Sequence, residues 1–177
     1  MKLRNCVMAT VLASAIWLGA CTVPAWVNAA ESDAAVAAPI AASLIEVIDP
    51  SLAPVVTLIE TGFNALAKTL DTYKASPTAT NLQAVQAAFA AVNANVAQLE
   101  AAAQIKNAAT ATKVTAIVQL LAQAVTEISA LVPPPTAAAL SAPMPKVQGQ
   151  AKGWKAKDFK REFNQIVKGD PRFKQLK

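Results

Sequence analysis

Apolar residues recur at alternating intervals of three and four along most of this chain. Three long segments show this spacing, which is typical of helices that bury one face. They cover about 51–75, 80–106 and 111–132. Their repeating apolar positions are Leu52, Val56, Ile59, Phe63, Leu66, Leu70 and Tyr73, then Leu82, Val85, Phe89, Val92, Val96 and Leu99, then Val114, Val118, Leu121, Val125, Ile128 and Val132.

Prolines mark two boundaries of these segments. Ser76-Pro77 separates the first helix from the second, and Pro133-Pro134-Pro135 ends the third. At 1.5 Å per residue each helix reaches about 33–40 Å, so the lengths match. Matched lengths and short connections predict an all-α fold, a three-helix antiparallel up-down bundle within residues 40–132. A short additional helix is expected over 40–48, where apolar residues are spaced by four.

The segments around this bundle have different compositions. Residues 21–39 are rich in alanine with scattered polar residues, which predicts a flexible tether. Residues 133–153 hold five prolines and two glycines and predict a Pro-rich linker. Residues 154–177 form a basic aromatic C-terminal tail, and a short amphipathic helix is expected over 158–168. Gly169 is a natural stop for that helix.

Alanine and charge change this picture. The chain is 54% hydrophobic, but 41 of its 177 residues are alanine, so its apolar content reflects helix formers more than bulky core residues. Residues 22–145 carry four lysines against eight acids, a net −4. Residues 146–177 carry ten basic residues against three acids, a net +7. This asymmetry indicates an interaction tail on a mildly acidic body.

The N-terminus has the features of an export signal. Lys2 and Arg4 precede an apolar, uncharged run that ends at Ala20. The sequence Leu18-Gly19-Ala20-Cys21 resembles the lipobox of bacterial lipoprotein precursors. The resemblance implies a signal peptide over 1–20, cleavage between Ala20 and Cys21, and acylation of Cys21. Because Thr22 stands where enterobacterial inner-membrane lipoproteins carry Asp, it also implies the outer membrane of a Gram-negative-type bacterium, facing the periplasm.

Two other interpretations of this segment stay open. Val27-Asn28-Ala29 offers an ordinary secretory cleavage site before Ala30, and the apolar run could instead stay uncleaved as an anchor. Under the lipoprotein interpretation Cys6 leaves with the signal and Cys21 is acylated. The mature chain then has no free thiol and no disulfide.

The residue inventory argues against catalysis. The chain has no histidine, which excludes Ser–His and Cys–His nucleophile pairs. It also has no Gly-rich phosphate loop. We therefore expect no enzyme activity, no catalytic residues, no cofactor and no metal site.

The tail is the best candidate for a partner-binding site. Basic residues interleaved with aromatics suit an anionic envelope polymer, a lipid headgroup layer or a partner protein. Export makes nucleic acid a poor partner. The candidate residues are Trp154, Lys155, Lys157, Phe159, Lys160, Arg161, Phe163, Lys168, Arg172 and Phe173.

One alternative concerns the role of this tail. Phe159, Phe163 and Ile166 could instead dock back on the bundle as an additional helix.

The sequence thus predicts a non-catalytic protein held in the membrane by acylated Cys21, with the tail as a second contact. The alternative is a secreted, non-lipidated helical module that binds a ligand or assembles with itself. The sequence does not set the oligomeric state.

Overall fold

The computed structural model describes residues 24–103, 111–133 and 153–177, which form five α-helices and, within those ranges, no strand. The all-α class is therefore confirmed. The helices are α1 (Ala25–Ala42), α2 (Ala53–Ala75), α3 (Ala79–Ala103), α4 (Ala111–Leu131) and α5 (Ala156–Ile166). The predicted signal peptide over 1–20 and residues 134–152 of the predicted linker lie outside the described residues.

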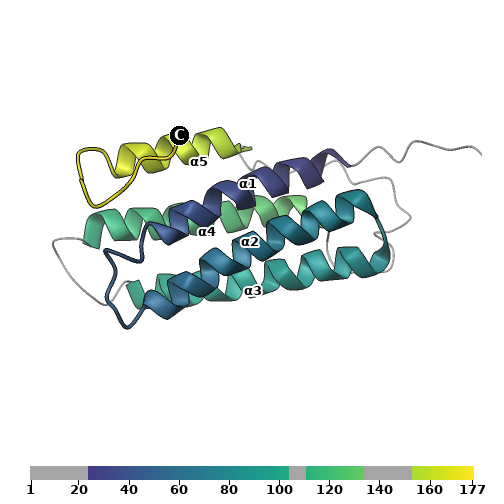
Figure 1. Cartoon of the computed structure of the whole chain (residues 1–177), viewed down its shortest axis with the longest axis horizontal. Coiled ribbons are helices and arrows are strands. Elements are labelled where there is room, and N and C mark those ends of the chain that lie inside the picture. Colours follow the sequence, from purple (N-terminus) through teal and green to yellow (C-terminus); the bar gives the residue numbers. More distant parts are fainter. Residues whose placement is uncertain (1–23, 104–110, 134–152) are drawn as a thin grey trace, which may run out of the picture.

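The first four helices form a four-helix bundle in which each helix contacts two others, and we call this arrangement the ring. It differs from the three-helix bundle expected from the sequence. Contacts join α1 to α2, α2 to α3, α3 to α4 and α4 back to α1. Figure 1 shows these four helices running in alternating directions. Helix α5 lies outside the ring against α1 and α4. The predicted long helices agree with α2, α3 and α4, and the helix that the prediction lacked is α1.

The tether predicted over 21–39 is wrong, because α1 occupies most of that segment. Alanine is the strongest helix former, and its small side chain allows neighbouring helices to approach closely. Ala30, Ala34 and Ala41 are fully buried, and Val27 near the start of α1 is buried with them. The alanines are therefore core residues of the ring. Pro39 lies inside α1 on its exposed side.

The short helix predicted over 40–48 is also wrong. Helix α1 ends at Ala42, and turns follow it over residues 43–47. The Ser43 hydroxyl donates a hydrogen bond to the Ile40 carbonyl (2.6 Å), which satisfies one acceptor at the helix end. The apolar spacing that suggested a separate helix belongs to the last turn of α1 and to Leu44, which is fully buried.

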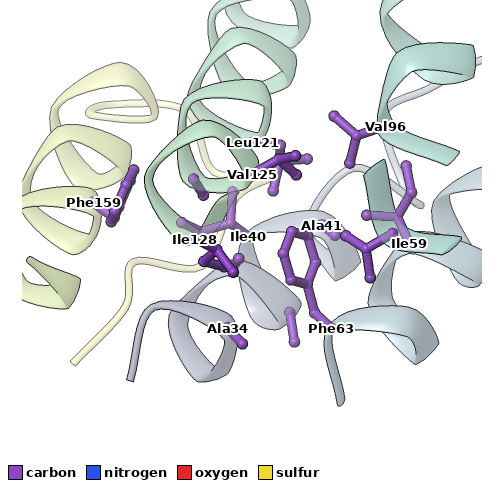
Figure 2. Close-up of a cluster of buried hydrophobic side chains, with 14 of the residues drawn as sticks. Ala34, Ile40, Ala41, Ile59, Phe63, Val96, Leu121, Val125, Ile128 and Phe159 are labelled. Atoms are coloured by element: carbon purple, nitrogen blue, oxygen red, sulfur yellow. The ribbon is translucent and has the colours of Figure 1, made fainter. Parts of the chain in front are cut away.

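Buried side chains from all five helices form one continuous core. Figure 2 shows Ile40 and Ile128 in the middle of this core, with Phe63 and Ile59 on one side and Phe159 of α5 on the other. All five of these residues are at most 1% exposed. Helix α5 therefore extends the core of the ring outward.

Helices α2 and α3 approach each other closely at Gly62. A Cβ atom at this position would lie 2.8 Å from Cγ2 of Val92, and Val92 is fully buried. The absence of a side chain at Gly62 therefore sets the distance between the two helices.

Within the described residues, α4 is the one helix long and apolar enough to cross a membrane. It packs against α1, α3 and α5. Ile117, Leu121 and Ile128 are fully buried on its inner side. We therefore describe α4 as a core helix of the ring.

Candidate functional site on the C-terminal segment

Local hydrogen bonds define the start of α5. The backbone N–H of Lys155, the N-cap residue, donates to Oδ2 of Asp158 at 3.0 Å. Arg161 pairs with the other carboxylate oxygen of Asp158 at 3.0 Å. The Lys155 N–H and the Arg161 guanidinium hold the pKa of Asp158 below its usual range. An acidic residue in the first turn also suits the positive end of the helix dipole.

The aromatic residues of the predicted site face the bundle. Phe159 is 1% exposed, Phe163 is fully buried, and Phe173 beyond the helix is 6% exposed. Trp154 is half-buried, with its ring centroid 5.3 Å from that of Phe159. Of the two outcomes left open by the sequence, the structure has the tail helix docked on the bundle. In this arrangement the three phenylalanines are not available to a partner.

The basic residues of the predicted site lie on the opposite side of α5. Lys155, Lys157, Arg161 and Lys168 are exposed, and Lys160 is half-buried. An open groove runs along this outer face, and no acidic residue lines it. Its lining residues are Ala156, Lys157, Lys160, Arg161, Asn164, Gln165 and Lys168. The structure thus divides the predicted residues into a buried aromatic set and an exposed basic set.

The last residues of the chain return along α5. The Asn164 side chain donates to the Leu176 carbonyl at 2.9 Å and accepts from the Leu176 N–H at 2.8 Å. Lys160 Nζ donates to the main-chain oxygen of Lys177. This return places Lys174 and Lys177 in a second open hollow beside Glu46. Sequence reasoning missed Asn164, because a lone Asn carries no signal for such a contact.

Asp170 anchors the turn after α5. Its carboxylate pairs with Lys113 of α4 at 3.1 Å and with Arg172 at 2.8 Å. The Arg172 guanidinium, with help from Lys113, holds the pKa of Asp170 well below its usual range. Arg172, which the sequence placed in the partner site, therefore has a structural partner. Gly169 precedes this turn with a φ of 77°, a backbone conformation that favours glycine.

Two buried carboxylates lie where α1, α4 and α5 meet. Asp33 of α1 is 3% exposed and Glu127 of α4 is 8% exposed. The backbone N–H of Ala156, the first residue of α5, donates to Asp33. Burial, and next the charge of Glu127, raise the pKa of Asp33 to about 6, while the Ala156 hydrogen bond opposes this rise. Burial also raises the pKa of Glu127.

Sequence reasoning missed this acid pair. The two residues are 94 positions apart, and Asp33 was assigned to the tether. The one signal was the position of Asp33 among apolar neighbours, which is visible only once α1 is known to be a helix.

The predicted cleavage and lipidation site lies outside the described residues. Ala20 and Cys21, the predicted cleavage and lipidation residues, fall outside the described ranges. Within those ranges no group of three or more His, Cys, Asp or Glu side chains is placed to hold a metal ion.

Comparison with known proteins finds no matching family model, curated protein or solved structure. The chain's own residues therefore carry the functional argument.

Proposed function

We propose that this chain is a non-catalytic, lipid-anchored cell-envelope protein that binds anionic lipid headgroups through the outer face of α5. One observation carries the proposal. Helix α5 packs its phenylalanines into the core and leaves a groove lined by four basic side chains and no acid. Clustered Lys and Arg near a surface attract anionic headgroups by about 1 kcal/mol per residue.

The start of α1 supports the anchoring part of the proposal. Cys21 precedes Ala25, the first residue of α1, by four positions. At no more than ~3.6 Å per residue, four residues span at most about 14 Å. An acylated Cys21 would hold the ring at the bilayer surface, and this replaces the long reach expected from a tether over 21–39.

The same helix favours cleavage before Cys21 over the secretory alternative. Cleavage after Ala29 would remove Trp26 and Val27, which are 6% and 0% exposed. It would also separate Trp26 from Tyr73 of α2, whose ring centroid lies 5.7 Å away. Cleavage between Ala20 and Cys21 leaves α1 intact.

The two membrane contacts reinforce each other. A second contact on an already anchored molecule forms at high effective concentration, so the headgroup contact need not be strong by itself. The basic groove supplies this contact without exposing the aromatic core. Because its charges are solvent-exposed, salt should screen the attraction strongly.

The anchor is tested by mass and fractionation. We expect the wild-type protein, produced in a Gram-negative host, to enter the membrane fraction with the mass of an acylated chain that begins at Cys21. The Cys21→Ser variant should lose the lipid mass. A wild-type protein without added lipid would refute the lipoprotein assignment, and cleavage after Ala29 would favour the secreted module.

The groove is tested on vesicles with the non-acylated Cys21→Ser protein. Lys157→Gln and Lys168→Gln each remove one exposed charge from the groove, and Lys68→Gln removes one exposed charge from α2 as a matched control. We expect the groove variants to weaken sedimentation with phosphatidylglycerol vesicles at low salt, and the control to leave it unchanged. Equal binding to vesicles of phosphatidylcholine alone would contradict recognition of anionic headgroups.

A further inference from the structure

The buried acid pair lies beneath the first turn of α5. Within the described residues, Asp33 and Glu127 are the two buried polar or charged side chains. They come from α1 and α4, the two helices that α5 packs against. The Ala156 N–H hydrogen bond shows that the start of α5 covers Asp33. Docking of α5 therefore keeps two like charges away from water, which is unfavourable when both are ionised.

On the surrounding helices Glu31 and Asp158 already have cationic partners, and Lys155 and Lys157 at the start of α5 are exposed to solvent. On α1, Glu31 pairs with Lys74 of α2 at 3.2 Å. On α5, Asp158 is held by the Lys155 N–H and by Arg161.

On α4 the one cation is Lys113, which is bound to Asp170 at 3.1 Å. The one charge that shifts the pKa of Asp33 is that of Glu127, and it raises this pKa. No cation therefore neutralises the acid pair within the described interface.

The absence of histidine gives the acid pair a particular role. Histidine is the residue that ordinarily changes charge between pH 5 and 8, and this chain has none. Ordinary carboxylates are mostly ionised over this whole range. A proton taken up by the described interface near pH 6 therefore goes to Asp33.

We propose that α5 and the following residues 167–177 form a releasable lipid-binding element, held docked by protons on Asp33 and Glu127 and freed as they ionise. Release exposes Phe159, Phe163 and Phe173 beside the basic residues of the outer face. A basic helix with a separate aromatic face lies in the interface of an anionic bilayer. This step rests on the proposed function, since it deepens the contact made by the outer face, whereas the docking equilibrium stands independently of it.

The pKa of Asp33 sets the expected size of the effect. A carboxyl whose pKa is raised in the docked state stabilises that state at low pH, and this stabilisation is lost as the pH rises through about 6. If release restores the ordinary value of 3.8, docking is about tenfold more favourable at pH 5 than at pH 8 from Asp33 alone. Glu127 adds to this factor in the same direction.

Amide hydrogen exchange of the full-length Cys21→Ser protein, without lipid, measures docking directly. After correction for the intrinsic pH dependence of exchange, we expect protection of amides in 159–166 to fall about tenfold from pH 5 to pH 8. Asp33→Asn keeps an oxygen for the Ala156 N–H and removes the charge, so it should abolish most of this change. Glu127→Gln, a second variant, should reduce it, and Asp71→Asn on the exposed side of α2 is the matched control.

Three results would overturn the proposal. The first is equal protection of α5 at both pH values in the wild type. The second is full pH dependence in an Asp33→Asn/Glu127→Gln double variant. The third is an equal loss of protection at Leu66 and Leu70 in α2, because the whole ring and not α5 alone would then be opening.

Vesicle sedimentation at both pH values separates this inference from the proposed function. If α5 is released at pH 8 and phosphatidylglycerol vesicles are not bound, the proposed function fails and the release stands. If vesicles are bound equally at pH 5 and pH 8 while protection is constant, the release fails and the anionic contact stands.

Discussion

Replacing Gly62 by alanine tests the close approach of α2 and α3. Alanine in a helix is ordinarily more stable than glycine by about 1 kcal/mol, because glycine loses more backbone entropy on folding. At Gly62 the added Cβ would lie 2.8 Å from Cγ2 of Val92. Carbon atoms pack best at ~3.5–4.0 Å, so the two helices must separate or Val92 must leave its preferred rotamer.

The neighbouring side chain makes this adjustment costly. Val92 is fully buried and β-branched, and a valine in a helix has one strongly preferred rotamer. Overpacking a core costs about 1–3 kcal/mol. Subtracting the gain of about 1 kcal/mol in helix propensity, we expect Gly62→Ala to destabilise the protein by about 1 kcal/mol.

A second substitution turns this prediction into a test of sign. Val92→Ala removes Cγ2 and leaves space for the new Cβ. In the Val92→Ala background, Gly62→Ala should therefore stabilise the protein by up to about 1 kcal/mol, as expected from helix propensity. Urea denaturation followed by circular dichroism at 25 °C gives the four free energies of unfolding. Thr61→Ala, on the exposed side of α2, is the control and should be neutral or slightly stabilising.

Either of two outcomes would refute the reasoning about Gly62. One is a Gly62→Ala protein more stable than the wild type. The other is the same destabilisation in the presence and absence of Cγ2 of Val92, which would place the cost elsewhere than in this contact.

Two further predictions concern the core and the C-terminal turn. Leu66 and Leu58 on α2 are 0% and 54% exposed. Leu66→Ala should therefore lower the free energy of unfolding by about 2–5 kcal/mol, whereas Leu58→Ala should change it by less than about 0.5 kcal/mol. Equal urea midpoints for the two variants would contradict the orientation of α2. Asp170→Asn should speed amide exchange at Phe173 at pH 7 by removing the pairs with Lys113 and Arg172. Because the pKa of Asp170 is lowered by folding, its contribution is fully present above about pH 4 and is lost as the pH falls further below that value. Wild type and variant should therefore converge only at pH values well below about 4.

The long helices could be predicted because their apolar residues are bulky and periodic. Val, Leu, Ile and Phe at intervals of three and four in α2, α3 and α4 leave one arrangement that buries them. Helix α1 has the same relation to the core but uses alanine at most of its buried positions, such as Ala30 and Ala34. An alanine run does not distinguish a buried helix from an exposed one, because what buries it is the neighbouring helices.

The candidate site, like the fold, could be predicted only in part from the sequence. The alternation of basic and aromatic residues in 156–168 is local, so the sequence predicts two faces of one helix. Which face is free depends on the surface offered by α1 and α4, and this is a tertiary property. The acid pair could not be predicted from the sequence, because Asp33 and Glu127 meet only when the ring closes.

The pairing of the first described helix with the last two has a consequence for how the chain folds. Helix α1 contacts α4 and α5 as well as α2, so the part of its buried surface that meets α4 and α5 stays uncovered until nearly the whole chain has been synthesised. Contacts so distant in sequence slow folding, because the loop entropy must be paid before they form. The two-helix unit of α1 and α2 can form early, but the ring closes last. A chain emerging from a ribosome or crossing a membrane therefore cannot close the ring for as long as its C-terminal third is missing.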